Sequence, residues 1–357
     1  MERVDPDRPS SPDRDRPGVR RWALGLAACL SLGLSGCNRV QSALSPGGAF
    51  AERLADHIWF FTWLCTAIWV LVMIALAVAL VRRRTAREGD AEPLALNEDH
   101  ERRTTRVVAG AVAATAVTVV VLTVSSYLTN KSLADMGEHP TLTLQVTGHQ
   151  WWWEVRYEDA DASQTLTTAN EIHIPVGEPV RLKLTSSDVI HSFWVPSLMG
   201  KEDLITGRQN TIVIQADRPG VFRGQCAEFC GLQHAHMGIL VIAEPREAFD
   251  AWYNTQLVPA ADPTEPERRR GRDVFVSKAC VMCHQIRGTT AGGRVAPELT
   301  HIGSRQTIAA GTLPLTRGSL AAWIADPQAI KPGANMPRVD LDPDELNAVV
   351  SYLEGLK

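Results

Sequence analysis

The sequence predicts a multidomain membrane protein that consists of a transmembrane helix hairpin, a β-sandwich and a small all-α domain. Three observations predict this order. Two uncharged apolar stretches lie within residues 50–130, short runs of alternating polarity fill residues 131–257, and a Cys-x-x-Cys-His motif lies within residues 268–357. A chain of 357 residues is long enough for these units, and its net charge of −4 gives no reason to expect a nucleic-acid partner.

Residues 1–36 have the layout of an extension followed by an export signal. Residues 1–17 are rich in Arg, Asp and Pro, a composition typical of disorder. An apolar run over residues 22–34 follows two arginines and leads through small residues to Cys37. The sequence Leu-Ser-Gly-Cys that ends at Cys37 resembles a bacterial lipobox, which implies cleavage before Cys37 and lipidation of its thiol. Ordinary signal cleavage nearby and an uncleaved segment are the alternatives.

Two stretches in residues 50–130 are long enough to span a bilayer. Ile58–Val81 and Val107–Leu128 carry no charge, and about 20 apolar residues cross the ~30 Å hydrocarbon core. Seven arginines lie on the connection between them, and clustered arginine marks the cytoplasmic side. We therefore expect everything after Leu128 outside the cytoplasm. The alternative, a buried helical hairpin of a soluble protein, is disfavoured by the length of the two stretches.

Residues 131–257 alternate between polar and apolar side chains. Short period-two runs punctuated by Gly and Pro indicate an antiparallel β-sandwich or barrel, and residues 246–256 are the first useful stretch with a helical period. Residues 130–257 hold nine Lys and Arg against sixteen Asp and Glu, a net charge of −7. Such an acidic surface suits a basic partner or serves solubility alone. The alternating runs are Thr141–Val146, Ile172–Ile174, Val180–Leu184, Thr211–Ile214 and Gly238–Ile242.

The segment from Cys226 to Met237 concentrates metal-binding residue types. It reads Cys-Ala-Glu-Phe-Cys-Gly-Leu-Gln-His-Ala-His-Met. Thiolate, imidazole and thioether are soft or borderline ligands, which select copper over magnesium or calcium. A single-copper electron-transfer site needs one Cys, whereas two thiols can bridge two metal ions. The predicted ligands are Cys226, Cys230, His234 and Met237, a carbonyl oxygen from Glu228, and His191 from a separate loop.

A zinc site and a disulfide with incidental histidines are the alternatives to copper. Zinc takes four Cys or His ligands, usually without Met, so Met237 in register with the other ligands favours copper. Three further histidines, His139, His173 and His236, fit surface or strand positions better than ligand positions.

Residues 258–357 predict a linker and a haem-binding domain. Residues 258–267 hold three prolines, and a short flexible linker there would keep the next domain at a millimolar effective concentration. The sequence Cys280-Val-Met-Cys283-His284 is the signature of covalent haem c, in which two thioethers tether the vinyl groups and His284 is an axial iron ligand. A zinc or redox pair is the alternative. The expected export and the small domain size favour haem, because a cofactor can fill a small core.

The sixth iron ligand is predicted downstream of the signature. Met336, in Gly-Ala-Asn-Met-Pro, is the favoured residue because the proline fixes the turn and a thioether raises the haem potential. His301 is the alternative ligand. The chain then ends in a predicted helix with Asp342 as N-cap, Pro343 at the first position and Glu345 completing a capping box.

Three motifs, together with the hairpin, resemble cytochrome c oxidase subunit II over residues 50–256. They are Gly-His-Gln-Trp-Trp-Trp at 148–153, His-Ser-Phe-Trp-Val-Pro at 191–196 and the segment 226–237. Residues 265–357 resemble a class I cytochrome c. The resemblance implies a cupredoxin-like β-sandwich with a dinuclear copper centre (CuA), an all-α cytochrome c domain and association with oxidase subunit I.

The same resemblance implies roles for individual residues. His191, Cys226, Cys230, His234 and Met237, with the Glu228 carbonyl, bind CuA. The Glu228 side chain faces a magnesium ion at the boundary with subunit I, and Trp151 matches the position that receives electrons from the donor. Family members usually carry a Glu-containing Trp-Thr-x-x-Pro stretch before the second span. Residues 101–106 lack Trp and Pro, so Glu101 is left out of the predicted site.

Three consecutive tryptophans occupy residues 151–153. On a strand Trp151 and Trp153 share one face and Trp152 takes the other, so at most two point into the core. An exposed Trp near a metal suits both partner binding and electron transfer. The alternative, strongest for Trp152, is an anchor at the level of the lipid headgroups.

The sequence thus predicts the electron-accepting subunit II of a haem–copper cytochrome c oxidase in a bacterial inner membrane, with both cofactor domains on the extracytoplasmic side. Electrons would pass from a cytochrome donor to haem c, to CuA and to subunit I, where oxygen reduction is coupled to proton translocation. A CuA-containing nitric oxide reductase subunit and a free-standing membrane electron carrier are the alternatives. A quinol oxidase is disfavoured because that lineage is expected to lack the two copper cysteines.

Overall fold

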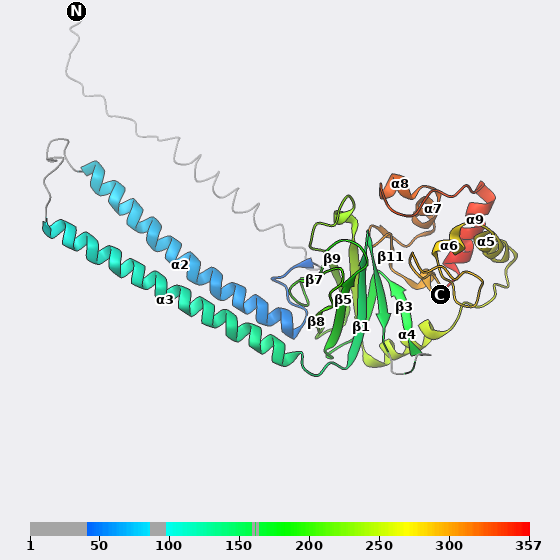
Figure 1. The fold of residues 1–357 in the computed structure, drawn as a ribbon, viewed down its shortest axis with the longest axis horizontal. Coiled ribbons are helices and arrows are strands. Elements are labelled where there is room, and N and C mark those ends of the chain that lie inside the picture. Colours follow the sequence, from blue (N-terminus) through cyan, green and yellow to red (C-terminus); the bar gives the residue numbers. More distant parts are fainter. Residues whose placement is uncertain (1–40, 86–97, 159–160, 162–163) are drawn as a thin grey trace, which may run out of the picture. The chain divides into compact units, whose positions relative to one another are not determined.

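The computed structural model describes residues 41–85, 98–158, 161 and 164–357 (Figure 1). Within these ranges the chain forms a two-helix hairpin, a sandwich of two sheets and a helical C-terminal domain, which confirms the predicted fold class. The predicted export signal and the lipidation site at Cys37 lie outside the described residues.

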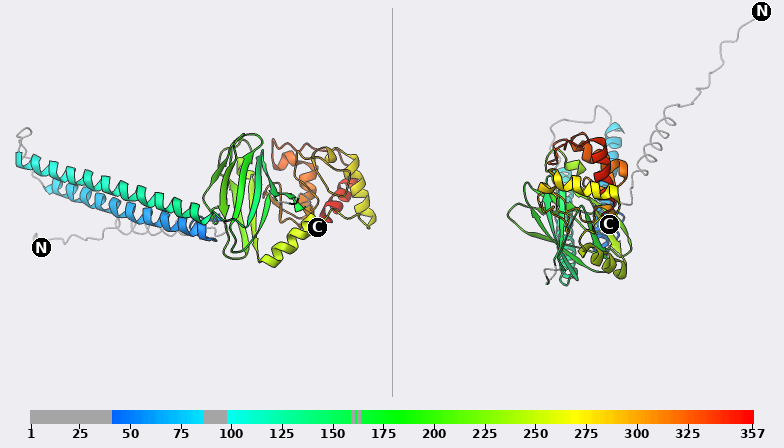
Figure 2. Two further views of the ribbon diagram at one scale, coloured as in Figure 1. Left: turned by 60° about the horizontal axis from the view of Figure 1, so that its bottom comes forward. Right: turned by 90° about the vertical axis from the view of Figure 1, so that its right-hand side faces the viewer.

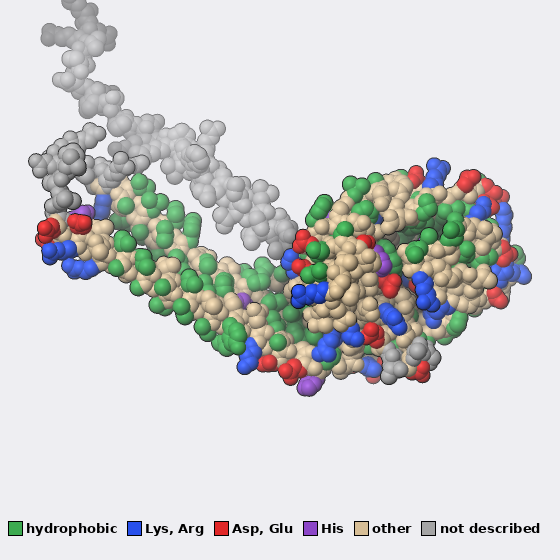
Figure 3. Space-filling model, in the orientation of Figure 1, with side chains coloured by type: hydrophobic (Ala, Val, Ile, Leu, Met, Phe, Trp, Pro, Cys, Tyr) green, Lys and Arg blue, Asp and Glu red, His purple; other side chains and the backbone are tan. Residues whose placement is uncertain are grey.

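The hairpin consists of helices α2 (Ala49–Thr85) and α3 (Glu98–Met136), which lie side by side (Figure 1, Figure 2). Both helices are long and apolar enough to cross a membrane. Apolar side chains line their visible face (Figure 3), as expected of helices whose surroundings are lipid. Polar contacts also join the pair, since His57 Nε2 of α2 lies 3.2 Å from Ser126 Oγ of α3.

Two five-stranded sheets form the sandwich, in the orders β3-β2-β1-β5-β8 and β4-β10-β9-β6-β7. The pairs β1–β5 and β4–β10 are parallel, so the sandwich is mixed and the purely antiparallel expectation was wrong. Parallel neighbours need a long connection, and the intervening strands supply it in both cases. The strands are β1 (Leu142–His149), β2 (Trp152–Tyr157), β3 (Leu166–Ala169), β4 (Glu171–Pro175), β5 (Val180–Ser186), β6 (His191–Trp194), β7 (Glu202–Leu204), β8 (Asn210–Ile214), β9 (Gly220–Cys226) and β10 (Gly238–Glu244).

The core of the sandwich lies between the two sheets. Strand β5 alternates buried and half-buried residues along its whole length, as a strand with one face on a core does. Trp153, Tyr157 and Phe193 are among the largest fully buried side chains. Helix α4 (Arg246–Leu257) packs its aromatic residues on this core, with the Trp252 and Tyr157 ring centroids 5.4 Å apart.

The C-terminal domain is built around helices α5 (Pro266–Ser277) and α9 (Pro343–Glu354). They cross closely at Gly271, where a Cβ atom would lie 1.9 Å from the Ala348 carbonyl oxygen. The predicted capping box of α9 is confirmed, because Asp342 Oδ1 accepts from Glu345 N and Glu345 Oε2 accepts from Asp342 N. The other elements are α6 (Cys280–Cys283), η4 (Ile302–Ser304), β11 (Thr307–Ile308), β12 (Leu313–Pro314), α7 (Arg317–Ala325) and α8 (Pro327–Ile330).

The chain around the start of the linker, after α4, forms hydrogen bonds with the C-terminal domain. Arg287 Nη1 donates to the Leu257 carbonyl at 2.9 Å, and Ala260 N donates to the Arg287 carbonyl at 2.9 Å. His301 Nε2 lies 2.9 Å from the Val258 carbonyl oxygen. These contacts tie the start of the linker to the C-terminal domain through partners that composition alone does not reveal, and helix α5 begins at Pro266, within the residues predicted as linker.

Candidate copper centre and haem site

The structure brings the predicted copper ligands together at one end of the sandwich. The Sγ atoms of Cys226 and Cys230 lie 3.8 Å apart, and His191 Nδ1 lies 3.8 Å from Cys226 Sγ. On the other side of the pair, His234 Nδ1 and Met237 Sδ lie 3.6 Å and 3.9 Å from Cys230 Sγ. His191, the two cysteines and Met237 are buried, while His234 is half-buried.

Strand pairing explains why these residues meet. Cys226 ends β9 and Met237 immediately precedes β10, and the two strands pair as an antiparallel hairpin, so the loop closes with Cys226 N donating to the Met237 carbonyl at 2.9 Å. His191 begins β6, which pairs with β9 so that Phe193 lies opposite Cys226. Three neighbouring strands of one sheet therefore present the histidine, the first cysteine and the methionine at the same edge.

The donor set fits a pair of copper ions. Both cysteines are free, since a disulfide would bring the sulfurs to about 2.05 Å, so the disulfide alternative does not describe this structure. The contact with Cys230 lowers the pKa of the Cys226 thiol far below its ordinary value, and the same contact raises the pKa of the Cys230 thiol. The Glu228 carbonyl oxygen lies 3.2 Å from Cys226 Sγ, within reach of the same site.

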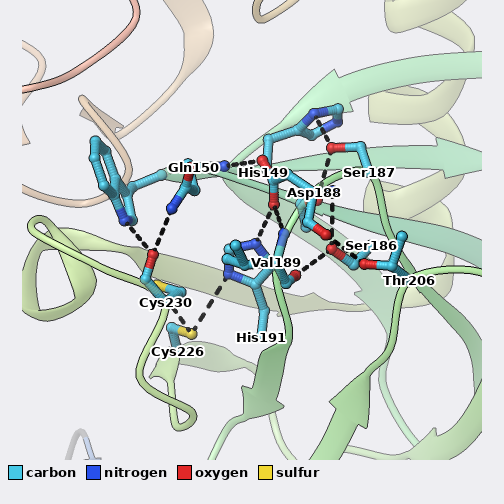
Figure 4. Close-up of polar contacts among 12 residues, drawn as sticks. His149, Gln150, Ser186, Ser187, Asp188, Val189, His191, Thr206, Cys226 and Cys230 are labelled. Atoms are coloured by element: carbon cyan, nitrogen blue, oxygen red, sulfur yellow. Dashed lines mark hydrogen bonds and ion pairs between the residues drawn. The ribbon is translucent and has the colours of Figure 1, made fainter.

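Asp188 is a neighbour of the copper site that sequence reasoning missed. Its Oδ1 lies 2.8 Å from His191 Nε2, so the carboxylate fixes the ring with Nδ1 toward Cys226 (Figure 4). Burial acts to lower the pKa of His191, but its contacts with Cys226 and Asp188 outweigh burial and raise it. Gln150 N donates to Asp188 Oδ2 at 2.7 Å and holds the carboxylate in turn. The only signal in the sequence was an Asp three residues before the histidine.

We expect Asp188→Asn to weaken copper binding about 10- to 100-fold, because partners that orient a metal-bound histidine typically contribute that much. The amide keeps the size of the side chain but removes its charge. Competition with a copper chelator measures the affinity. Asp217→Asn, at an exposed aspartate of the same domain, is the matched control and should leave the affinity unchanged. Equal affinities for Asp188→Asn and the unchanged chain would contradict the role of Asp188.

The three tryptophans occupy different environments. Trp153 is fully buried and Trp151 is 9% exposed, so these two are the tryptophans that point inward, and neither is freely exposed to a partner. Residues of the C-terminal domain cover Trp151, since a Cβ atom on Gly333 would lie 3.7 Å from its ring. Trp151 Nε1 donates to the Cys230 carbonyl at 3.0 Å, which ties the indole to the backbone of a predicted copper ligand.

Trp152 lies on the opposite side of the strand, as alternation predicts. Its ring stacks on His149 with centroids 4.3 Å apart and an interplanar angle of 7°. It lines a cavity of about 370 Å³ together with Arg287 and Arg294 of the C-terminal domain. This position favours a contact between domains over a headgroup anchor.

The haem signature occupies the short helix α6. Cys280 and Cys283 are free thiols at its two ends. His284 Nδ1 lies 2.7 Å from the Pro297 carbonyl oxygen, which orients the ring and leaves Nε2 available to iron. Burial lowers the pKa of His284, which favours the neutral, ligating form of the imidazole. The residues present therefore fit a covalently attached haem.

The two candidates for the sixth ligand differ in their contacts. His301 is 5% exposed and directs Nε2 to the Val258 carbonyl of the linker. Met336 follows α8 and is half-buried, and its carbonyl accepts from Gln328 Nε2 at 2.9 Å. The engagement of His301 with the linker favours Met336, whose thioether remains the predicted ligand.

Two of the remaining histidines have partners of their own. His173 stacks on Trp252 at 3.9 Å and lies 3.0 Å from Glu244 Oε2, while His236 Nδ1 lies 2.7 Å from Gln233 Oε1. Both partnerships agree with the expectation that these residues are not copper ligands.

Comparison with known proteins relates both cofactor domains to families. Residues 142–244 match the family described as cytochrome c oxidase subunit II, periplasmic domain, and residues 269–357 match the cytochrome c family. The crystal structure of the periplasmic domain of cytochrome oxidase subunit II from Bradyrhizobium japonicum is 32% identical, covers 34% of this chain and 96% of that chain, and has a TM-score of 0.32.

Two bacterial relatives match over nearly the whole chain. Cytochrome c oxidase subunit 2 of Alkalihalophilus pseudofirmus is 35% identical over 337 residues, which are 92% of this chain and 95% of the relative. Cytochrome c oxidase subunit 2 of Bacillus subtilis is 29% identical over 361 residues, which are 95% of this chain and 99% of the relative. These matches span the hairpin and both cofactor domains, and the chain therefore belongs to the cytochrome c oxidase subunit II family, with a cytochrome c domain fused after its copper domain.

Proposed function

We propose that the chain is the electron-accepting subunit of a haem–copper oxidase in a bacterial inner membrane, with both cofactor domains on the extracytoplasmic side. It takes electrons from a cytochrome donor and delivers them to subunit I, where oxygen is reduced and protons are translocated. One observation carries the proposal: two buried thiols 3.8 Å apart with His, His and Met around them, in the same chain as a haem c signature. Haem c and the copper pair, when bound, supply the one-electron chemistry.

The residues of the chain hold and shield these groups. Cys226 and Cys230 would bridge the copper ions, with His191 and His234 as the imidazole ligands and Met237 as a weak ligand. The buried positions of both cysteines keep water away from the site. Asp188 fixes the orientation of His191, so the ring would present Nδ1 to the copper site.

Glu228 and Trp151 have further proposed roles. The Glu228 carbonyl would fill a weak copper position, and its half-buried side chain would face a magnesium ion at the boundary with subunit I. Trp151 would lie on the route of electrons into copper, because its indole N–H bonds the Cys230 carbonyl.

The test is to purify the complex by an affinity tag on this chain and to measure its consumption of oxygen and of nitric oxide. We expect the chain to co-purify with a multi-span haem subunit and the complex to consume oxygen with a reduced cytochrome c as donor. Consumption of nitric oxide without oxygen consumption would assign the chain to a nitric oxide reductase. A chain that purifies alone, with no such subunit, would be a free-standing carrier, and either result would overturn the proposal.

A further inference from the structure

Lys331, at the end of α8, is a buried cation between the two cofactor domains. It is 3% exposed. Its Nζ donates to the Trp151 carbonyl at 2.8 Å, the His236 carbonyl at 2.9 Å and the Ala309 carbonyl at 3.3 Å. Two of these acceptors belong to the copper domain and one to the C-terminal domain, so a single ammonium group joins both.

Burying this charge is unfavourable unless the acceptors stay in place. Burial lowers the pKa of Lys331 to about 8. An ammonium has three donors and no acceptor capacity, and three carbonyl oxygens match all three donors. If the domains separated or shifted, the group would lose acceptors from the copper domain, so the hydrogen bonds specify one relative position of Lys331 and Trp151.

The segment after Lys331 lies directly on the copper domain. Gln233 Nε2 donates to the Pro332 carbonyl at 2.7 Å, and Asn335 Nδ2 donates to the Gln150 carbonyl at 3.4 Å. A Cβ atom on Gly333 would lie 3.1 Å from the Leu232 side chain as well as 3.7 Å from the Trp151 ring. The segment 332–336 thus runs from the Lys331 contact across Trp151 to the predicted iron ligand Met336.

We propose that Lys331 is the positioning residue for electron transfer between haem and copper: it fixes the segment 332–336, which ends at the predicted iron ligand Met336, on Trp151 and the copper loop. This inference rests on the proposed function. Lys331 touches neither cofactor in the proposal and acts through the backbone that it holds.

A second buried charge provides a matched control. Glu171 of the copper domain is 3% exposed and accepts from Gln306 N at 2.7 Å and Thr307 N at 3.0 Å of the C-terminal domain. It joins the same two domains but contacts neither Trp151 nor the segment 332–336. Glu171→Gln therefore weakens the interface without touching the path that Lys331 holds.

The experiment compares Lys331→Met, Lys331→Arg and Glu171→Gln in the full chain within the purified complex. The rate of amide hydrogen exchange measures how firmly residues 331–336 are held. The rate of electron transfer from photoreduced haem to copper measures whether the electron path is intact. Lys331→Met should speed exchange at residues 331–336 at least about tenfold, the effect of losing charged hydrogen bonds, and should slow transfer from haem to copper, with unchanged haem and copper spectra. Lys331→Arg keeps the positive charge and the hydrogen-bond donors. It should therefore restore part of the slow exchange at residues 331–336 and part of the fast electron transfer.

Glu171→Gln should speed exchange near Gln306 and slow transfer far less than Lys331→Met. Unchanged exchange at residues 331–336 in Lys331→Met would overturn the proposal, and so would equal slowing of transfer by both variants. Failure of the proposed function looks different: the unchanged chain would lack the copper pair or pass no electron from haem to copper. Exchange at residues 331–336 would still decide whether Lys331 fixes the segment.

Discussion

Cys226→Ser is expected to abolish the dicopper signal in electron paramagnetic resonance and to reduce oxygen consumption by the complex to background. The thiol of Cys226 lies 3.8 Å from that of Cys230, and the other cysteines in the described part of the chain belong to α2 and α6, so none of them can replace it as a bridge. A serine hydroxyl stays protonated at neutral pH and is a poor ligand for copper, which prefers soft donors. The spectrum and the rate of oxygen consumption are measured on the same preparation.

Cys65→Ser is the matched control, since Cys65 is an exposed cysteine of helix α2. It should leave both the copper signal and oxygen consumption unchanged. A Cys226→Ser chain that kept a shared-electron dicopper spectrum would show that this thiol does not bridge, and the proposed ligand set would fail.

Met336→Leu is expected to leave haem attached but to lower its reduction potential by on the order of 0.1 V, a fraction of the roughly 0.8 V that axial ligands span. The thioether bonds to Cys280 and Cys283 do not involve Met336, so attachment survives. Loss of a thioether ligand removes the term that raises the potential. A spectroscopic redox titration measures the shift, and oxygen consumption with a cytochrome donor should fall with it.

Met282→Leu is the control for this change. Met282 lies inside the signature and is 74% exposed, so its replacement should leave the potential where it was. An unchanged potential in Met336→Leu would assign the sixth position to another residue. His301→Ala would then be the next variant, because His301 is the alternative ligand.

The parts of the site that are local in sequence could be predicted. Cys226, Cys230, His234 and Met237 fall within twelve residues of one hairpin loop, so their spacing alone brings them together. Period-two patterning located five of the ten strands described in the sandwich, β1, β4, β5, β8 and β10, and the Asp342 cap marked the start of α9. Each of these features depends on residues that are close together in the sequence, which is why it can be predicted from the sequence.

Long-range features could not be predicted in the same way. The parallel pairing of β1 with β5 depends on how distant strands meet. The burial of Trp151 and of Lys331 depends on the packing of the C-terminal domain against the copper domain, and a lysine before a proline gives no sign of it. The Pro-rich linker has a flexible composition, yet carbonyls at Leu257 and Val258 are held by side chains far away in sequence.

The most direct test of the central claim, that one chain holds a bridged copper pair beside a covalent haem, is metal analysis and electron paramagnetic resonance of the full chain matured with both cofactors. We expect two copper ions for each haem iron, with one unpaired electron shared between the coppers and a low-spin haem signal beside it. One copper ion for each haem iron, with a spectrum of the electron localised on a single copper, would contradict the claim.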